Sequence, residues 1–197
     1  MRSIEAEPAW SARIPIALVT CVLLLSLPVR TNGQPVDTVT EQSIKAAYLY
    51  KFAAYVEWPE HVFASKSTPV TIGVYGADAL AGELAEITAE RTVQGRRIVT
   101  RLIRRDAVLD QLDGIHILFI ARSGVSDLAA LAASASVHSV LVVTEDGEAL
   151  GRGSVINFKP VDQRIRFDVS LASADKNHLK LSSRLLAVAE HVEPRQN

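Results

Sequence analysis

Apolar residues recur along the chain in two rhythms, one with helical spacing and one nearly continuous. The helical rhythm first appears at Glu41–Trp58, where Thr40 is suited to cap the helix start and Pro59 cannot continue it. The apolar positions that fall on one stripe of this helix are Ile44, Tyr48, Phe52 and Tyr55. We therefore predict an opening helix whose aromatic side chains mostly turn inward.

Strands and helices alternate after this helix. The stretch 69–76 alternates apolar residues and ends at a glycine, which predicts a strand, and 78–90 follows with helical spacing and Asp78 as its cap. Further strands are predicted at 96–103, 115–121 and 139–145, with helices at 106–112 and 125–135 between them. Because strands alternate with helices, we expect right-handed crossovers and a mostly parallel sheet with helices on both faces.

The pattern changes near the end of the chain. Residues 153–160 and 164–170 read as two strands separated by a short turn, which predicts a β-hairpin at the edge of the sheet. The tail, 171–192, has helical spacing and is expected to break near Asn177. The predicted fold class is therefore α/β, with a mostly parallel sheet and a C-terminal β-hairpin.

The chain begins with a secretory signal. An apolar run at 14–29 follows two arginines, and Thr31 and Gly33 stand at the −3 and −1 positions of a leader-peptidase site. A membrane anchor is disfavoured because the run is shorter than the roughly 20 apolar residues that span a bilayer. A lipoprotein is disfavoured because a threonine precedes Cys21. We expect residues 1–33 to be a cleaved signal peptide and 34–197 to form one secreted domain.

Composition narrows the function further. The 197 residues are 48% hydrophobic and 22% charged, which is typical of a globular domain. Without residues 1–33, the 21 basic and 22 acidic residues become 18 and 20, so nothing attracts nucleic acid. Cys21 is the single cysteine and leaves with the signal peptide, which excludes a disulfide, a thiolate nucleophile and redox sensing through cysteine.

Motifs for catalysis and cofactor binding are missing. Ser123 and Ser126 lack the first glycine of a nucleophile elbow and read as turn and cap residues, while Gly73 and Gly76 form no complete dinucleotide fingerprint. No two of the five histidines have the spacing of a helical zinc pair. We therefore predict no catalytic residue, no metal and no cofactor, and binding becomes the expected activity.

The order of these segments resembles one family, the YfiR-like (HmsC-like) periplasmic proteins, from about Ile44 to Ala189. The pieces that carry the resemblance are "KAAYLYKFAAYVEWP", "IGVYG", "IHILFIARS", "GSVINF", "RIRFDV" and "LKLSSRLLAVA". Ser154 stands where the family often has a second glycine, so the turn there is expected to differ. Ser170 replaces a common asparagine and can still cap the following helix.

The resemblance implies a non-catalytic regulator with a three-layer, Rossmann-like fold that is often a homodimer. Such proteins bind the periplasmic domain of an inner-membrane diguanylate cyclase and hold it inactive. Release of this repressor, helped in some systems by an outer-membrane lipoprotein, raises cyclic di-GMP and promotes biofilm formation.

Two sets of residues are candidates for binding. Tyr55 and Trp58 at the end of the opening helix, and Leu181 and Leu185 in the tail, are candidates for a partner or dimer surface, with core packing as the alternative.

The second hypothesis is a small-molecule sensor or solute-binding module. Its ligand would lie beyond the carboxyl ends of the parallel strands. The residues expected there are Arg122, Ser123, Glu145 and Asp146. A crevice with converging polar groups would favour this hypothesis, and a filled strand edge would oppose it.

Overall fold

A computed structural model describes residues 40–105 and 112–195. The predicted signal peptide, 1–33, lies outside the described residues, and so does the predicted helix 106–112 except for Leu112. The helices are α1 Glu41–Tyr55, α2 Asp78–Thr88, α3 Leu128–Val137, α4 Leu171–Lys176 and α5 Ser183–Ala187. The strands are β1 Val56–Glu57, β2 Val70–Tyr75, β3 Thr92–Val93, β4 Arg96–Ile103, β5 Ile117–Ile120, β6 Leu141–Thr144, β7 Ile156–Val161, β8 Arg164–Ser170, β9 Lys180–Leu181 and β10 His191–Glu193.

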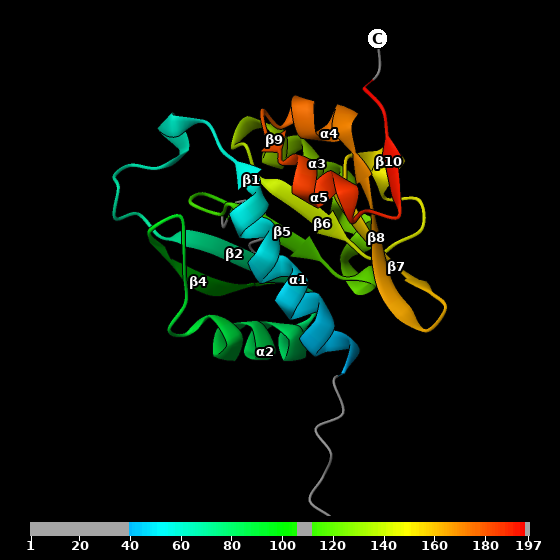
Figure 1. Ribbon diagram of the computed structural model, residues 1–197, viewed down its shortest axis with the longest axis horizontal. Coiled ribbons are helices and arrows are strands. Elements are labelled where there is room, and N and C mark those ends of the chain that lie inside the picture. The colour runs from blue at the N-terminus through cyan, green and yellow to red at the C-terminus, as the bar shows by residue number, and fades with distance from the viewer. Residues whose placement is uncertain (1–39, 106–111, 196–197) are drawn as a thin grey trace, which may run out of the picture. The chain divides into compact units, whose positions relative to one another are not determined.

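Eight strands form one mixed sheet in the order β10-β8-β7-β6-β5-β2-β4-β3 (Figure 1). Its centre is parallel, because β4, β2, β5, β6 and β7 all run in the same direction. β8 runs antiparallel to β7, β10 runs parallel to β8, and β3 runs antiparallel to β4. The fold is therefore α/β as expected, with antiparallel pairing towards both edges.

The predicted hairpin is confirmed between β7 and β8. Its turn places Asp162 and Gln163 at φ of 47° and 60°, the left-handed conformations that a two-residue hairpin requires. The prediction that the hairpin forms the edge of the sheet is wrong, because β10 pairs with the outer side of β8.

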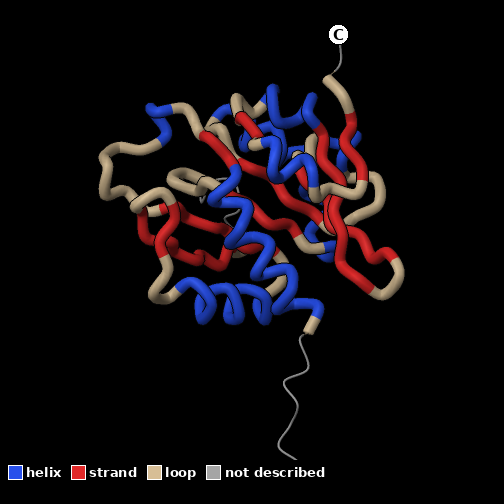
Figure 2. The backbone as a smooth tube through the Cα atoms, viewed as in Figure 1, coloured by secondary structure: helices blue, strands red, loops and turns tan. Residues whose placement is uncertain are grey.

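The tail is less helical than its apolar spacing predicts. Figure 2 shows short helices and strands in succession, and α4 ends at the expected break, where Asn177 is buried and its Nδ2 donates to the Val140 carbonyl oxygen at 2.8 Å. Backbone pairing of β9 with β1 and of β10 with β8 replaces the predicted helical hydrogen bonds. The helical spacing of apolar residues in the tail therefore reflects which side chains contact the core. The backbone conformation is determined by strand pairing with distant segments.

Both faces of the sheet carry a hydrophobic cluster, because alternate strand side chains project to opposite sides. On one face, α1 and α5 contribute Leu49, Phe52 and Leu185. On the other, α3 contributes Leu128 and Leu131. Helices therefore pack against both faces, and α1 crosses the first face (Figure 1).

The start of α1 follows the prediction and its end does not. Thr40 Oγ1 accepts from the Ser43 N–H at 3.1 Å, as an N-cap does. The helix ends at Tyr55 rather than Trp58, because β1 follows at once and pairs with β9. In α2, the N-cap is Ala77 without a side-chain bond, so the prediction of Asp78 as the cap is wrong.

Candidate functional site

A crevice lies where the strand order reverses. β2, β5 and β6 are parallel, and the residues after their carboxyl ends, including Gly76, Arg122 and Glu145, line one cavity of about 720 Å³. β4 lies on one side of β2 in the sheet, and β5, which follows β4 in the chain, lies on the other side of β2. Open α/β sheets bind ligands at such a reversal of strand order. The first turns of α1 and α2 complete the walls.

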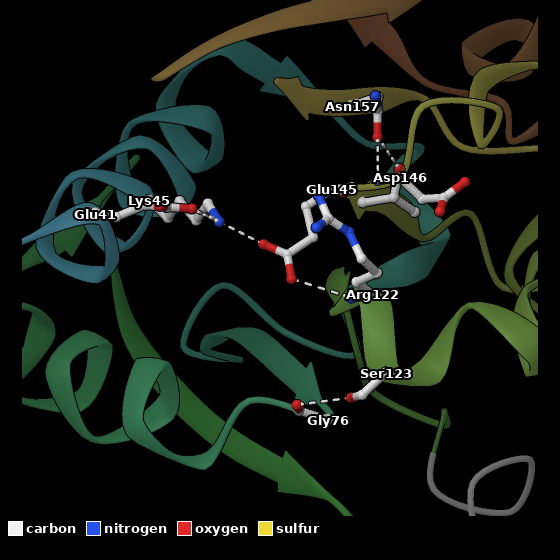
Figure 3. Close-up of polar contacts among 9 residues, drawn as sticks. Glu41, Lys45, Gly76, Arg122, Ser123, Glu145, Asp146 and Asn157 are labelled. Atoms are coloured by element: carbon white, nitrogen blue, oxygen red, sulfur yellow. Dashed lines mark hydrogen bonds and ion pairs between the residues drawn. The ribbon is translucent and has the colours of Figure 1, made fainter. Parts of the chain in front are cut away.

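Lys45 joins α1 to this edge of the sheet. Its ammonium donates hydrogen bonds to the carboxylates of Glu41, one turn earlier, and Glu145, which follows β6 (Figure 3). The residue is only 8% exposed. Burial lowers the pKa of Lys45, but the hydrogen bonds and charges of Glu145 and Glu41 outweigh it, so the pKa lies above the ordinary value of 10.5. Lys45 therefore stays charged at neutral pH and holds both carboxylates.

Glu145 connects three elements. One carboxylate oxygen accepts from Lys45, and the other, Oε1, accepts from the Arg122 backbone N–H at 3.0 Å. The Arg122 guanidinium donates to the Glu145 carbonyl oxygen at 3.4 Å, and Ser123 Oγ donates to the Gly76 carbonyl oxygen at 3.0 Å. These contacts fix the loops after β2, β5 and β6 against one another, so the crevice has a preformed polar wall.

Asp146 does not share this wall. Its side chain points away from the Glu145 carboxylate (Figure 3), and Oδ1 accepts from the Glu148 N–H at 3.2 Å. Its backbone N–H donates to Asn157 Oδ1 at 3.0 Å. The structure therefore brings together Arg122, Ser123 and Glu145 and leaves Asp146 outside the crevice lining.

The turn before β7 keeps one glycine and adds a buried hydroxyl. Gly153 has φ of 104°, and a Cβ there would lie 2.8 Å from the Ala132 Cβ. Ser154 is fully buried, and its Oγ lies 2.8 Å from Thr144 Oγ1. Thr144 in turn bonds Asn157, so Ser154 is part of the polar network that orients Asp146.

The four partner-surface candidates separate into surface and core. β1 pairs with β9, which places Val56 opposite Leu181, and the Ser182 N–H donates to the Tyr55 carbonyl oxygen at 2.9 Å. Tyr55, Trp58 and Leu181 are half-buried, and we call them the helix-end surface. Leu185 is 1% exposed and packs in the core, which is the alternative that the sequence left open for it.

Trp58 packs against a layered cluster at the amino end of β5. Its indole N–H donates to the His116 carbonyl oxygen at 3.3 Å. The His116 ring stacks on Phe63 at 4.5 Å between centroids, and the Arg96 guanidinium lies 3.9 Å from the Phe63 centroid on that ring. His116 is 1% exposed, so its ring packs inside the protein.

His116 is held in its neutral form. Nδ1 accepts from the Thr71 N–H at 3.1 Å, and Nε2 has no hydrogen-bond partner in the described parts of the chain. Burial, with the nearby Arg96 charge, lowers the pKa of His116 from 6.5 to about 4, although the Gly114 backbone opposes this shift. Acid therefore favours the unfolded chain, in which His116 takes up a proton at higher pH.

We expect a pH-dependent loss of stability from this histidine. Because the folded pKa is lower than the unfolded one, stability is present above pH 6.5 and falls as pH drops towards 4. Between pH 7 and pH 5 the loss is about 2 kcal/mol. Urea unfolding, followed by Trp58 fluorescence, gives the free energy of unfolding of the wild-type protein and of the His116→Asn variant at each pH. The loss is the difference between the slopes of these two free energies against pH. Equal slopes would contradict the prediction.

Sequence reasoning missed Lys45. It lies on the buried side of α1 beside Ala46 and Leu49, not on the predicted aromatic stripe. Its only sequence signal is an acidic residue four positions earlier, which by itself indicates a solvated helix pair. The partner that draws it inward, Glu145, is 100 residues away, so only the fold reveals the contact.

The described residues contain no helix long and apolar enough to cross a membrane. In the same ranges, no group of three histidine, cysteine, aspartate or glutamate side chains could hold a metal ion. The crevice can therefore offer a ligand hydrogen bonds and charges, and the helix-end surface can offer a partner apolar area and strand edges.

Comparison with known proteins places these features in a family. Curated proteins give no match. Among matching solved structures is the crystal structure of a conserved domain protein from Vibrio cholerae O1 biovar El Tor str. N16961, with a TM-score of 0.54 and 11% identity. The match covers 78% of this chain and 60% of that protein, so this chain spans less than two thirds of its length. At this identity the likeness shows the fold alone.

The sequence profile of the YfiR/HmsC-like family matches residues 42–190, from the first turn of α1 to the residue before β10. This range includes the crevice lining from Gln42 onwards and the helix-end surface. The chain therefore belongs to the YfiR/HmsC-like family, whose members are periplasmic regulators of cyclic di-GMP signalling.

Proposed function

We propose that this protein is exported with residues 1–33 as its signal peptide and represses an inner-membrane diguanylate cyclase by binding its periplasmic domain. The observation that carries the proposal is the family match over residues 42–190. The three-layer, Rossmann-like arrangement, a homodimeric state and release by an outer-membrane lipoprotein belong to the same proposal. The protein acts without catalysis, and the nucleotide itself stays in the cytoplasm.

Repression requires different affinities for two states of the cyclase. A regulator that bound both conformations equally would shift nothing, however tightly it bound. The regulator must therefore bind the inactive conformation more tightly than the active one, and must release the cyclase when the signal arrives. The helix-end surface is suited to this contact, because Tyr55, Trp58 and Leu181 are half-buried aromatic and aliphatic side chains beside an exposed β9 residue, Lys180.

Removing one charge from this surface tests the proposal. Lys180 is exposed and lies opposite Glu57 in the β1–β9 pair, so Lys180→Gln removes its charge without placing two carboxylates opposite each other and should leave the fold intact. This variant should raise cellular cyclic di-GMP towards the level of a gene deletion and weaken capture of the cyclase domain several-fold. Lys176→Gln, at an exposed lysine on α4, is the matched control and should leave both unchanged. A deletion strain with unchanged cyclic di-GMP, and no cyclase captured from solubilised membranes, would contradict repression itself.

A second candidate, a sensor of small polar molecules, is favoured by the preformed crevice of about 720 Å³. The two functions are compatible, because α1 joins the sites. Lys45 lies by the crevice, and Tyr55 lies ten residues later on the same helix, about 15 Å along its axis. A ligand that displaced Glu145 from Lys45 would shift this helix at its far end, which gives a physical route for coupling.

A further inference from the structure

One long edge of the sheet is open over most of a strand. β4 pairs along Ile98–Ile103 with β2, but on its other side β3 covers only Arg96 and Arg97. In the described residues, no other strand pairs with that side of β4. Alternate residues from Ile98 onwards therefore present backbone N–H and C=O groups that an added strand can bond.

The side chains on this edge combine charge with exposed apolar surface. Arg97, Val99 and Arg101 alternate, so they project from the same face of the sheet. The described residues include four exposed large hydrophobic side chains, and two of them, Val99 at 38% and Leu102 at 44%, belong to β4. Among the described residues, the Arg101 guanidinium donates to the Asp113 carbonyl oxygen at 3.2 Å.

The charge of this strand decides what can pair with it. β4 contains three arginines and no acidic residue, although the whole chain has a net charge of −1. If two copies paired antiparallel through β4 about a two-fold axis at Val99, Arg97 would lie opposite Arg101 of the other copy. Like charges directly opposite in a sheet are destabilising, so this register disfavours a second copy of the chain.

We infer that the open edge of β4 binds an extended acidic segment of a partner protein by strand addition. The partner strand would place an apolar side chain beside Val99 and carboxylates beside Arg97 and Arg101. Backbone hydrogen bonds supply sequence-independent affinity, and the paired charges select an acidic strand. The edge differs from the helix-end surface, so this inference does not depend on a cyclase being the partner.

Protection against aggregation is the simpler explanation of edge arginines, and the two explanations predict different results. A purely protective edge should bind no strand. A binding edge should accept one whose charges complement its own, and the exposed Val99 between the two arginines is out of place in a strand that serves only to repel.

The test uses a labelled ten-residue peptide in which glutamate alternates with valine or threonine. We expect it to bind the mature protein, with amide NMR shifts centred on β4. The double variant with Arg97→Glu and Arg101→Glu should bind this peptide at least tenfold more weakly. It should instead prefer a peptide that carries lysine in place of glutamate. Arg164→Glu with Arg184→Glu changes the net charge equally at other exposed positions and should alter binding less than twofold.

Methylating the peptide's backbone nitrogens that would pair with β4 removes their hydrogen-bond donors but leaves the protein and all charges unchanged. This methylated peptide should not bind. The inference is overturned if the methylated peptide binds equally well, if both double variants weaken binding equally, or if the shifts fall outside β4. Binding to phosphatidylglycerol vesicles without peptide binding would instead identify this edge as a basic membrane-contact surface, which also overturns it.

Discussion

Replacing Phe52 by alanine is expected to destabilise the fold by about 4 kcal/mol, the typical cost of removing a buried phenylalanine ring. The ring is 1% exposed and lies at the centre of an aromatic cluster that joins α1 to the β7–β8 hairpin. Its centroid lies 5.1 Å from that of Phe167 and 5.8 Å from that of Phe158, with Tyr48 at 5.9 Å on the helix. Alanine would leave a cavity that three neighbouring rings cannot close.

Urea unfolding of the mature chain measures this cost, and Phe52→Leu provides the volume control. Leucine retains much of the lost volume, so its cost should be about 1.5 kcal/mol. If alanine cost no more than leucine, Phe52 would not anchor the helix to the hairpin. Because α1 carries both candidate sites, we also expect Phe52→Ala to lose partner capture through unfolding rather than through surface chemistry.

Replacing Lys45 by methionine is expected to destabilise the fold by about 3 kcal/mol, the lower end of the range for breaking one side of a buried ion pair. Methionine fills the space but leaves the Glu145 carboxylate, whose side chain is 20% exposed, without its cation. Glu145 still accepts from the Arg122 N–H, so water and this one bond must solvate the charge. The crevice wall should loosen along with the fold.

A double-mutant cycle separates the pair from simple packing. Glu145→Gln removes the charge that Lys45 balances, and the double variant Lys45→Met with Glu145→Gln should recover at least 1 kcal/mol relative to the sum of the single changes. Glu41→Gln is the exposed control, because the Glu41 side chain is 62% exposed and its pair should contribute under about 0.5 kcal/mol. Strict additivity would show that Lys45 and Glu145 do not stabilise each other.

Family membership and the site geometry answer different questions. The family match gives the class of regulator, while the structure describes two candidate sites, the crevice and the helix-end surface. They lie towards opposite ends of α1, whose N-cap is at Thr40 and whose last residue is Tyr55. A variant such as Lys45→Met can therefore be assayed at both ends, with ligand binding at one and partner capture at the other.

Much of the fold could be predicted because local signals agreed with it. Nearly continuous apolar runs predict buried strands at β5 and β6, and both are buried at every position. β2, which was predicted from alternating apolar residues, is also buried at every position. Thr40 and Ser170 predict helix starts through side-chain caps that the structure contains. The crevice was also predictable, because the carboxyl ends of parallel strands meet at one edge whatever the side chains are.

The sequence by itself determined the α/β class, the hairpin, the family resemblance and the approximate place of Arg122, Ser123 and Glu145. Only the tertiary structure decided the roles that depend on distant partners. In the structure, Asp146 points away from the crevice, Leu185 is buried, and Lys45 bonds Glu145. The helix α1 ends early because β1 pairs with β9. Periodicity reports which residues avoid water, but the partner of each group is fixed by contacts between residues far apart in the chain.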